Sequence, residues 1–189
     1  MPKTKVGFAL TGSFCTFDKA ISTMQNLTEN NYDITPIMSA NAAFTNTRFG
    51  ACEDIKAKIS KICDKEIITD IVAAEPIGPQ KLLDILIIAP CTGNTIGKLA
   101  GGITDTSVTM AAKSHLRNNR PLLIAISTND GLAASAKNIG LLLNQRNVYF
   151  VPLAQDDPSG KPRSLVADFT KIEQGIELAL KGEQIQPIF

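Results

Sequence analysis

Residues 86–98 read Leu-Ile-Ile-Ala-Pro-Cys-Thr-Gly-Asn-Thr-Ile-Gly-Lys, and this stretch decides the fold of the chain. The continuous apolar run at residues 84–89 predicts a strand that is buried on both faces. A turn of small hydroxyl and amide side chains follows, and a helix starts near Thr95. In a parallel α/β sheet such a junction lies at the carboxyl end of a strand, where ligands bind. Its backbone N–H groups and helix N-terminus predict a site for an anionic group.

Strand-like and helical patterns alternate along the rest of the chain. Predicted strands cover residues 5–10, 32–38, 66–72, 84–89, 121–126 and 148–151, and predicted helices cover residues 17–30, 52–63, 95–99, 107–118, 133–145 and 165–180. Strands separated by helices predict a parallel sheet with right-handed crossovers. We therefore expect one α/β domain over residues 1–189, of the flavodoxin-like or Rossmann-like kind. Its parallel sheet would carry helices on both faces, in three layers.

Polar turns end three of the predicted strands. They are Thr11-Gly12-Ser13, the segment from Pro90 to Thr95, and Ser127-Thr128. In a sheet whose predicted strands are ordered third, second, first, fourth, the first two turns meet at the topological switch point. Each turn alone is also compatible with an ordinary connection, and the following Asn129-Asp130-Gly131 is typical of a plain turn. Three polar turns at carboxyl ends together favour one shared ligand.

Two loops and one motif add to this picture. Ser39 follows the second predicted strand, and residues 39–50 predict a binding loop that faces the same crevice, or simply a polar loop. Residues 154–164 predict either a lid or a loop held by its prolines. Residues 93–99 are similar to a P-loop, but one spacer is missing and Leu99 replaces the Mg²⁺-binding hydroxyl residue. A magnesium nucleotide is therefore not expected.

Composition excludes several classes of partner. The net charge is +1 and no basic stripe stands out, so neither nucleic acid nor an anionic membrane is expected to bind. No apolar run approaches the roughly 18 residues of a membrane span, and the run at residues 6–10 is too short for a signal peptide. The four cysteines form no CxxC pair and there is one histidine, so no metal site is expected. We expect a cytoplasmic protein with reduced thiols.

Few side chains offer acid–base or nucleophilic chemistry. His115 lies within a predicted helix, and we expect it to face solvent or an interface. Cys91 has no evident histidine to activate it and is expected to pack as a small residue. Glu75 and Asp105 are the carboxylates expected nearest the crevice. Either would serve as a general base or as a helix-end charge.

The turns together resemble those of the flavoprotein family, which contains homo-oligomeric FMN proteins such as cysteine decarboxylases and flavin prenyltransferases. The family's small turn after the first strand, serine after the second, and Pro-Ala-Ser-Ala-Asn-Thr after the central strand are similar to Thr11-Gly12-Ser13, Ser39 and residues 90–95 here. The resemblance implies an FMN pocket and a trimer-based homo-oligomer. It implies that the cofactor is bound by Gly12, Ser13, Ser39, Thr92, Asn94, Thr95, Ser127 and Thr128.

Longer strings resemble one branch of that family, the B subunits of dipicolinate synthases. These strings are residues 74–84, 89–94, 110–113, 127–130 and 149–156. The branch implies that a small cyclic dicarboxylate of the dihydrodipicolinate type, from the lysine pathway, is oxidised to dipicolinate during sporulation. It also implies a separate A subunit that carries NAD(P), and a location in the mother-cell cytoplasm of an endospore-forming bacterium. Glu75 is then the candidate catalytic base.

Two departures separate the chain from its decarboxylating relatives. Those relatives carry a histidine before the central strand where this chain has Glu75-Pro76-Ile77, and an asparagine where it has Thr106. Both departures argue against cysteine decarboxylation. Two alternatives remain: a non-catalytic partner protein with a vestigial flavin pocket, or a flavin-dependent decarboxylase or prenyltransferase.

Overall fold

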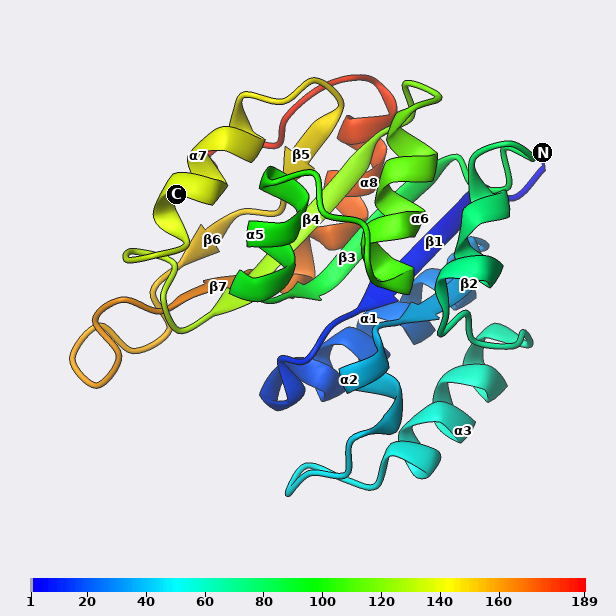
Figure 1. Cartoon of the computed structure of the whole chain (residues 1–189), viewed down its shortest axis with the longest axis horizontal. Helices are drawn as coiled ribbons and strands as arrows, with labels where there is room; N and C mark the ends of the chain where they lie inside the picture. Colours follow the sequence, from blue (N-terminus) through cyan, green and yellow to red (C-terminus); the bar gives the residue numbers. More distant parts are fainter. Residues whose placement is uncertain (1) are drawn as a thin grey trace.

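The computed structural model describes residues 2–189 and contains one seven-stranded sheet. Its order is β2-β1-β3-β4-β7-β6, with β5 also paired to β4. Strands β1 to β5 pair in parallel, whereas β7 runs antiparallel to both β4 and β6. The strands are β1 (Lys5–Leu10), β2 (Asp33–Met38), β3 (Ile85–Cys91), β4 (Leu122–Thr128), β5 (Val148–Phe150), β6 (Leu153–Ala154) and β7 (Leu165–Ala167). The predicted parallel sheet is confirmed, with a short antiparallel addition at one edge (Figure 1).

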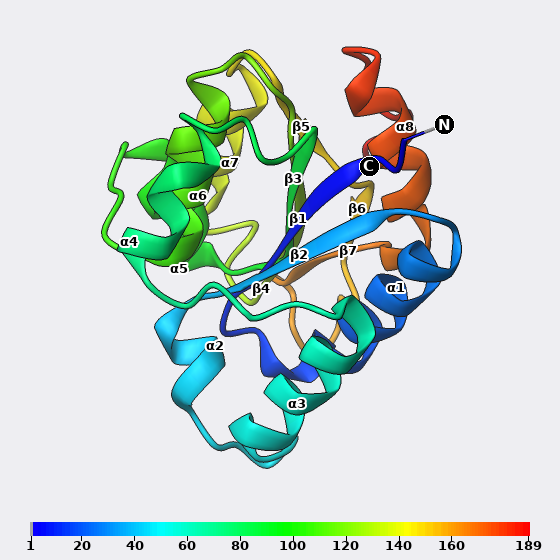
Figure 2. The same cartoon turned by 90° about the vertical axis from the view of Figure 1, so that its right-hand side faces the viewer.

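Helices cover both faces of the sheet. Helices α1, α3 and α8 lie on one face and α4, α5, α6 and α7 on the other, which gives the expected three layers (Figure 2). The helices are α1 (Phe17–Glu29), α2 (Ala40–Phe44), α3 (Cys52–Cys63), α4 (Ile71–Ala74), α5 (Gly93–Ala100), α6 (Ser107–Leu116), α7 (Ala136–Leu143) and α8 (Ile172–Leu180). Short 3₁₀ turns are η1 (Phe14–Thr16), η2 (Glu75–Ile77) and η3 (Phe169–Lys171). Because β1 leads to α1 and β3 leads to α5, their connections leave toward opposite faces.

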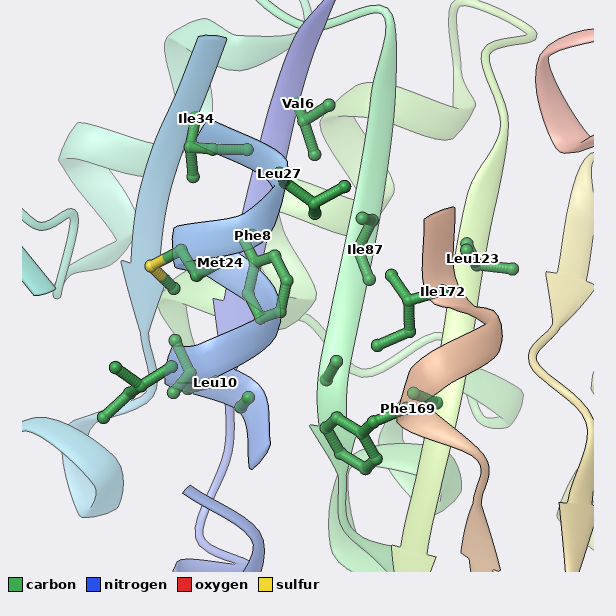
Figure 3. Close-up of a cluster of buried hydrophobic side chains, with 14 of the residues drawn as sticks. Val6, Phe8, Leu10, Met24, Leu27, Ile34, Ile87, Leu123, Phe169 and Ile172 are labelled. Atoms are coloured by element: carbon green, nitrogen blue, oxygen red, sulfur yellow. The ribbon is translucent and has the colours of Figure 1, made fainter. Parts of the chain in front are cut away.

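Two apolar cores lie on either side of the sheet. Phe8 of β1 and Ile87 of β3 pack under α1 and the start of α8, together with Met24 and Ile172 (Figure 3). Alternate residues of β3 point to opposite faces, as the pleat of a strand requires, so its apolar run serves both cores. The expected doubly buried central strand is confirmed.

A register shift interrupts this alternation at the end of β3. Residues 85, 87 and 89 belong to the first core, and Leu86 and Ile88 belong to the second. Strict alternation would return Cys91 to the first core, yet it packs in the second. The pairing with β4 shifts between Ile88 and Cys91, as at a β-bulge. The shift therefore sets the direction in which the chain enters the turn before α5.

Two predicted elements are wrong. The strand expected at residues 66–72 is reduced to one bridge between Ile68 and Ile37. Asp70 accepts a hydrogen bond from the Ala73 backbone N–H at 2.8 Å, which starts helix α4 and ends any strand. The helix expected over residues 165–180 begins as β7, because β4 extends past β5 and offers an edge where Ser127 pairs with Val166. Helix α8 starts only at Ile172.

The expectation for His115 is also wrong. Its side chain is 1% exposed, and its Nε2 lies 3.0 Å from the Pro121 carbonyl oxygen. Because burial disfavours the charged imidazolium, it lowers the pKa of His115 to about 4. The residue is a neutral part of the packing between α6 and the start of β4.

Candidate functional site

The turns after β1 and β3 are hydrogen-bonded to each other. The Thr11 hydroxyl donates to the Pro90 carbonyl at 2.8 Å, and the Thr92 backbone N–H donates to the Thr11 hydroxyl oxygen at 3.0 Å. The Thr11 backbone N–H also donates to the Pro90 carbonyl, at 3.2 Å. The two turns therefore meet at the switch point, as the sequence predicts.

Helix α5 begins directly at this junction. The Thr92 hydroxyl caps it by accepting a hydrogen bond from the Thr95 backbone N–H at 3.4 Å. The Thr92 and Thr95 hydroxyl oxygens are 3.2 Å apart, and Asn94 is exposed at the start of the helix. The helix N-terminus is thus bordered by hydroxyl and amide groups, which suit an anionic or polyhydroxyl ligand.

The turn after β4 joins the other two. The Ser127 and Ser13 hydroxyl oxygens are 2.7 Å apart. The Thr128 hydroxyl donates to Asp130 Oδ1 at 2.6 Å, and the Ser135 hydroxyl donates to the same oxygen at 2.8 Å. These two hydrogen bonds lower the pKa of Asp130. Because the Thr128 proton is held by a carboxylate, its hydroxyl oxygen keeps only acceptor capacity for a ligand.

Gly93 allows this close approach of the two turns. A Cβ at residue 93 would lie 2.6 Å from the Ser135 Oγ and 2.7 Å from both Asp130 Oδ1 and the Thr128 Oγ1. Any side chain there would push the turn after β3 away from the turn after β4. The glycine in the opening motif is therefore required by packing within the protein.

Two cavities share this edge of the sheet, and both are lined by Gly12 and Thr92. The smaller, of about 310 Å³, extends toward α2 and the start of α5. The larger, of about 650 Å³, extends toward β4 and the loops at residues 45–50 and 155–164. All eight residues predicted to bind the cofactor line one cavity or the other: Gly12, Ser39, Thr92, Asn94 and Thr95 in the smaller, and Gly12, Ser13, Thr92, Ser127 and Thr128 in the larger.

Glu75, the predicted base, is not brought into this crevice. It lines neither cavity, and its exposed side chain belongs to η2. Its carbonyl oxygen accepts a hydrogen bond from the Ser114 hydroxyl at 3.0 Å, near the end of α6. The start of α6 lies at the crevice side, where the Ser107 hydroxyl donates to the Met38 carbonyl at 2.6 Å. About two helical turns of α6 thus separate Glu75 from the carboxyl edge.

The second carboxylate singled out by the sequence is already paired. Asp105 accepts two hydrogen bonds of 2.8 Å from the Lys98 ammonium group, which lines the smaller cavity. This contact lowers the pKa of Asp105. Cys91 is fully buried, and burial raises the pKa of its thiol, so it packs as expected instead of acting as a nucleophile.

Sequence reasoning missed the charged and aromatic lining of the larger cavity. Lys19, Arg48, Phe49, Asp156 and Lys161 contribute to it, from α1 and from two loops. Only the interpretations of residues 39–50 as a binding loop and of residues 154–164 as a lid pointed toward four of them, and Lys19 was missed entirely. Within residues 2–189, no group of three or more His, Cys, Asp or Glu residues is arranged to hold a metal ion, and no helix is long and apolar enough to cross a membrane.

Comparison with known proteins identifies the family. The sequence model described as Flavoprotein matches residues 1–172. The chain belongs to the flavoprotein family. The B subunit of dipicolinate synthase from Bacillus subtilis (strain 168) is 44% identical to this flavoprotein over 184 residues, which cover 97% of the chain and 92% of the relative.

Solved structures agree with this assignment. The crystal structure of the dipicolinate synthase B subunit from Bacillus halodurans C is 42% identical to this flavoprotein and has a TM-score of 0.90. The match covers 98% of this chain and 95% of the other. The FMN-dependent cysteine decarboxylase SpaF shares the fold at a TM-score of 0.71 and 21% identity, covering 95% and 97% of the two chains. The flavodoxin-like three-layer fold is thereby confirmed.

Proposed function

We propose that this flavoprotein binds FMN at the crevice and acts as the B subunit of a dipicolinate synthase. The observation that carries the proposal is the pair of cavities that meet at Gly12 and Thr92, on the switch point between β1 and β3. Its substrate would be a dihydrodipicolinate-type cyclic dicarboxylate from the lysine pathway, oxidised during sporulation. Likeness to the Bacillus subtilis dipicolinate synthase protein over nearly the whole chain supports the choice of reaction.

The residues at the crevice fit FMN in two respects. Gly12 has no packing role, because a Cβ there would meet only the Phe14 ring at 3.7 Å and Asn41 Cβ at 3.9 Å. Its bare backbone thus leaves room for a group that approaches the edge of both cavities. The hydroxyls and amide around the start of α5 would hold the phosphate and ribityl chain, together with Gly12 and Ser39. Ser13, Ser127 and Thr128 would border the ring in the larger cavity.

The hydroxyl groups of Ser13, Ser127 and Thr128 would each have a role in positioning the reactants. When bound, FMN supplies a two-electron acceptor next to the substrate. The Thr128 hydroxyl oxygen, whose proton is held by Asp130, would accept a hydrogen bond from a ligand N–H. The Ser13 and Ser127 hydroxyls would fix the position of the ring from the side of β1 and β4. Because the product ring is aromatic, the oxidation is favourable, and the main contribution of the protein is to position FMN and the substrate.

A base role for Glu75 needs a second copy of the chain. Since η2 lies away from both cavities, its carboxylate would reach the crevice only if a neighbouring copy presented it. We propose a trimer-based homo-oligomer in the cytoplasm of the mother cell. An apolar groove of about 250 Å³, lined by Leu99, Ile103 and Leu116 among others, is consistent with such packing. Light scattering during size-exclusion chromatography measures the oligomer mass, and a monomer would contradict it.

The proposal also includes an A subunit that carries NAD(P). The test has two stages. The purified chain is first mixed with FMN, and its visible absorption spectrum and flavin fluorescence are recorded after removal of free cofactor. It is then combined with the A subunit, NAD(P) and the dihydro-dicarboxylate substrate, and dipicolinate is measured. We expect retained flavin and dipicolinate formation that needs both proteins. A protein that retains no flavin, yet stimulates the A subunit, would instead establish a non-catalytic partner.

A further inference from the structure

The loop between α2 and α3 ends in a tight hairpin that presents two large side chains. The backbone N–H and carbonyl groups of Thr47 and Gly50 bond to each other in both directions at 3.1 Å, which leaves Arg48 and Phe49 at the tip. The Asn46 side chain accepts a hydrogen bond from the Cys52 backbone N–H at 2.9 Å, so the loop is anchored to the start of α3. The loop extends beyond the carboxyl ends of the strands (Figure 1).

Both tip residues line the larger cavity while remaining exposed. The Arg48 guanidinium carbon lies 4.9 Å from the centroid of the Phe49 ring, a cation–π contact that orients the group before any ligand arrives. Phe49 is 48% exposed, so part of its ring is accessible to a ligand in the cavity. A ligand in the cavity can therefore contact both the apolar Phe49 ring and the positively charged Arg48 guanidinium group.

The charges in this cavity do not cancel locally. Asp156 is paired with Lys161 at 3.2 Å, and Asp130 is held by the Thr128 and Ser135 hydroxyls. Among residues 2–189, neither Arg48 nor Lys19 forms an ion pair with a carboxylate. Lys19 and Arg48 thus line the cavity without an ion-pair partner, whereas the Asp130 carboxylate is stabilised by two hydroxyl groups and is not neutralised by a cation. A ligand with two negative groups would match Lys19 and Arg48.

We infer that Arg48 and Lys19 bind the two carboxylates of a flat cyclic dicarboxylate, whose ring stacks on Phe49. The inference rests on the proposed function and adds the residues that select its substrate. Arginine binds a carboxylate through two parallel N–H···O bonds, whereas Lys19, in the first turn of α1, supplies a compact charge to the same cavity. Offset stacking on the exposed Phe49 ring suits a planar six-membered ring.

The test is a calorimetric titration of the FMN-saturated full chain with dipicolinate and, separately, with picolinate, which lacks the second carboxylate. We expect wild type to prefer dipicolinate. Arg48→Gln weakens dipicolinate binding by about 10- to 100-fold, the range of a lost charge-assisted pair. The same variant binds picolinate with a smaller loss, so the preference shrinks. Lys19→Gln behaves in the same way, and Phe49→Leu shows a smaller loss for both ligands.

Arg146→Gln is the matched control, because Arg146 is an exposed arginine that lines neither cavity. It leaves both affinities unchanged, and the melting temperature and retained flavin of every variant match wild type.

If wild type makes dipicolinate but Arg48→Gln and Lys19→Gln bind it as tightly as Arg146→Gln, the inference is overturned and the proposed function stands. If no flavin is retained but dipicolinate binding still depends on Arg48, the subsite stands and the flavin mechanism fails. If wild type binds no dipicolinate, the inference is wrong.

Discussion

The hydroxyl groups that line the crevice differ from the polar side chains at the amino edge of the sheet. At the amino edge, Asn118 donates to the Gly78 carbonyl at 2.7 Å, Arg120 donates to the Leu83 carbonyl, and His115 contacts the Pro121 carbonyl. These side chains are bound to backbone carbonyl groups of neighbouring elements, and Arg120 also pairs with Asp84 at 3.4 Å. At the carboxyl edge, Thr11 and Ser107 also donate to backbone carbonyls, but Ser13 and Ser127, which line the larger cavity, bond to each other and keep further donors or acceptors.

This difference separates stabilising polar groups from ligand-binding ones. A buried polar group that is bonded to the backbone contributes to stability, and its removal leaves an unsatisfied partner. A hydroxyl that faces a cavity contributes little to the free energy of unfolding. Its hydrogen bond contributes mainly to ligand binding. We therefore expect substitutions at the carboxyl edge to change ligand affinity more than stability, and substitutions at the amino edge to do the reverse.

The largest expected effect is at Gly12. Gly12→Val places a branched side chain at the edge shared by both cavities, and we expect FMN affinity to fall about 100-fold, near the upper end of overpacking costs. The melting temperature should stay close to that of wild type, because a Cβ there meets nothing nearer than 3.7 Å. Flavin fluorescence titration measures the affinity. Gly140→Val is the control, since a Cβ at Gly140 has no neighbour within 4 Å and Gly140 lines neither cavity. Equal flavin affinity in Gly12→Val and Gly140→Val would contradict the placement of Gly12 at an edge shared by both cavities.

The second effect is a pH dependence of stability at the amino edge. The folded-state pKa of His115, about 4, lies below the unfolded value of 6.5, so the unfolded chain binds the proton first as pH falls. Its contribution is therefore complete above pH 6.5 and is lost between pH 6.5 and about 4, at a cost on the order of 3 kcal/mol. Urea unfolding from pH 7.5 to 4 measures this loss. His115→Gln should show a flatter profile whatever its absolute stability, and parallel profiles would contradict the prediction.

A smaller effect is expected at Asp130, which orients Thr128. Asp130→Asn replaces the charged acceptor of two hydroxyl protons with a neutral amide. We expect FMN affinity to fall about 3- to 10-fold, the contribution of roughly one hydrogen bond. Thr128→Ser keeps the hydroxyl and should bind FMN as wild type does. A loss in Thr128→Ser as large as that in Asp130→Asn would show that the methyl group matters, not the fixed proton.

The smallest effect is expected at Glu75. Because the residue lines neither cavity of its own chain, Glu75→Gln should change FMN affinity by less than about twofold. Its melting temperature should also be unchanged, since the side chain is exposed. Fluorescence titration of the flavin checks the first statement. A large loss of FMN affinity would contradict this prediction and show that Glu75 contributes to flavin binding.

The parallel sheet could be predicted because the sequence pattern that indicates it lies within short stretches of the chain. The apolar run of β3 and the polar turn after it are both visible in residues 84–98, and the three turns at carboxyl ends follow from the order of elements. The eight predicted crevice residues converge for the same reason, since parallel strands bring their carboxyl ends to one edge.

What the sequence did not reveal depends on tertiary pairing. Residues 165–167 have no strand signal of their own and pair only because β4 leaves an edge open. The burial of His115 depends on the carbonyl of Pro121 across a turn. Arg48 and Lys19 are 29 positions apart, and nothing in their neighbourhoods indicates a common cavity.

The hairpin at residues 47–50 closes on itself through two backbone bonds and shares no ladder with the sheet. The side chains at positions 48 and 49 can therefore be replaced without repacking either core. Such substitutions change which ligands the cavity binds. Such separation of scaffold from selectivity is what lets one architecture diversify its substrates through few mutations. Libraries randomised at these two positions are the most direct starting point for redesigning this protein toward other ring acids.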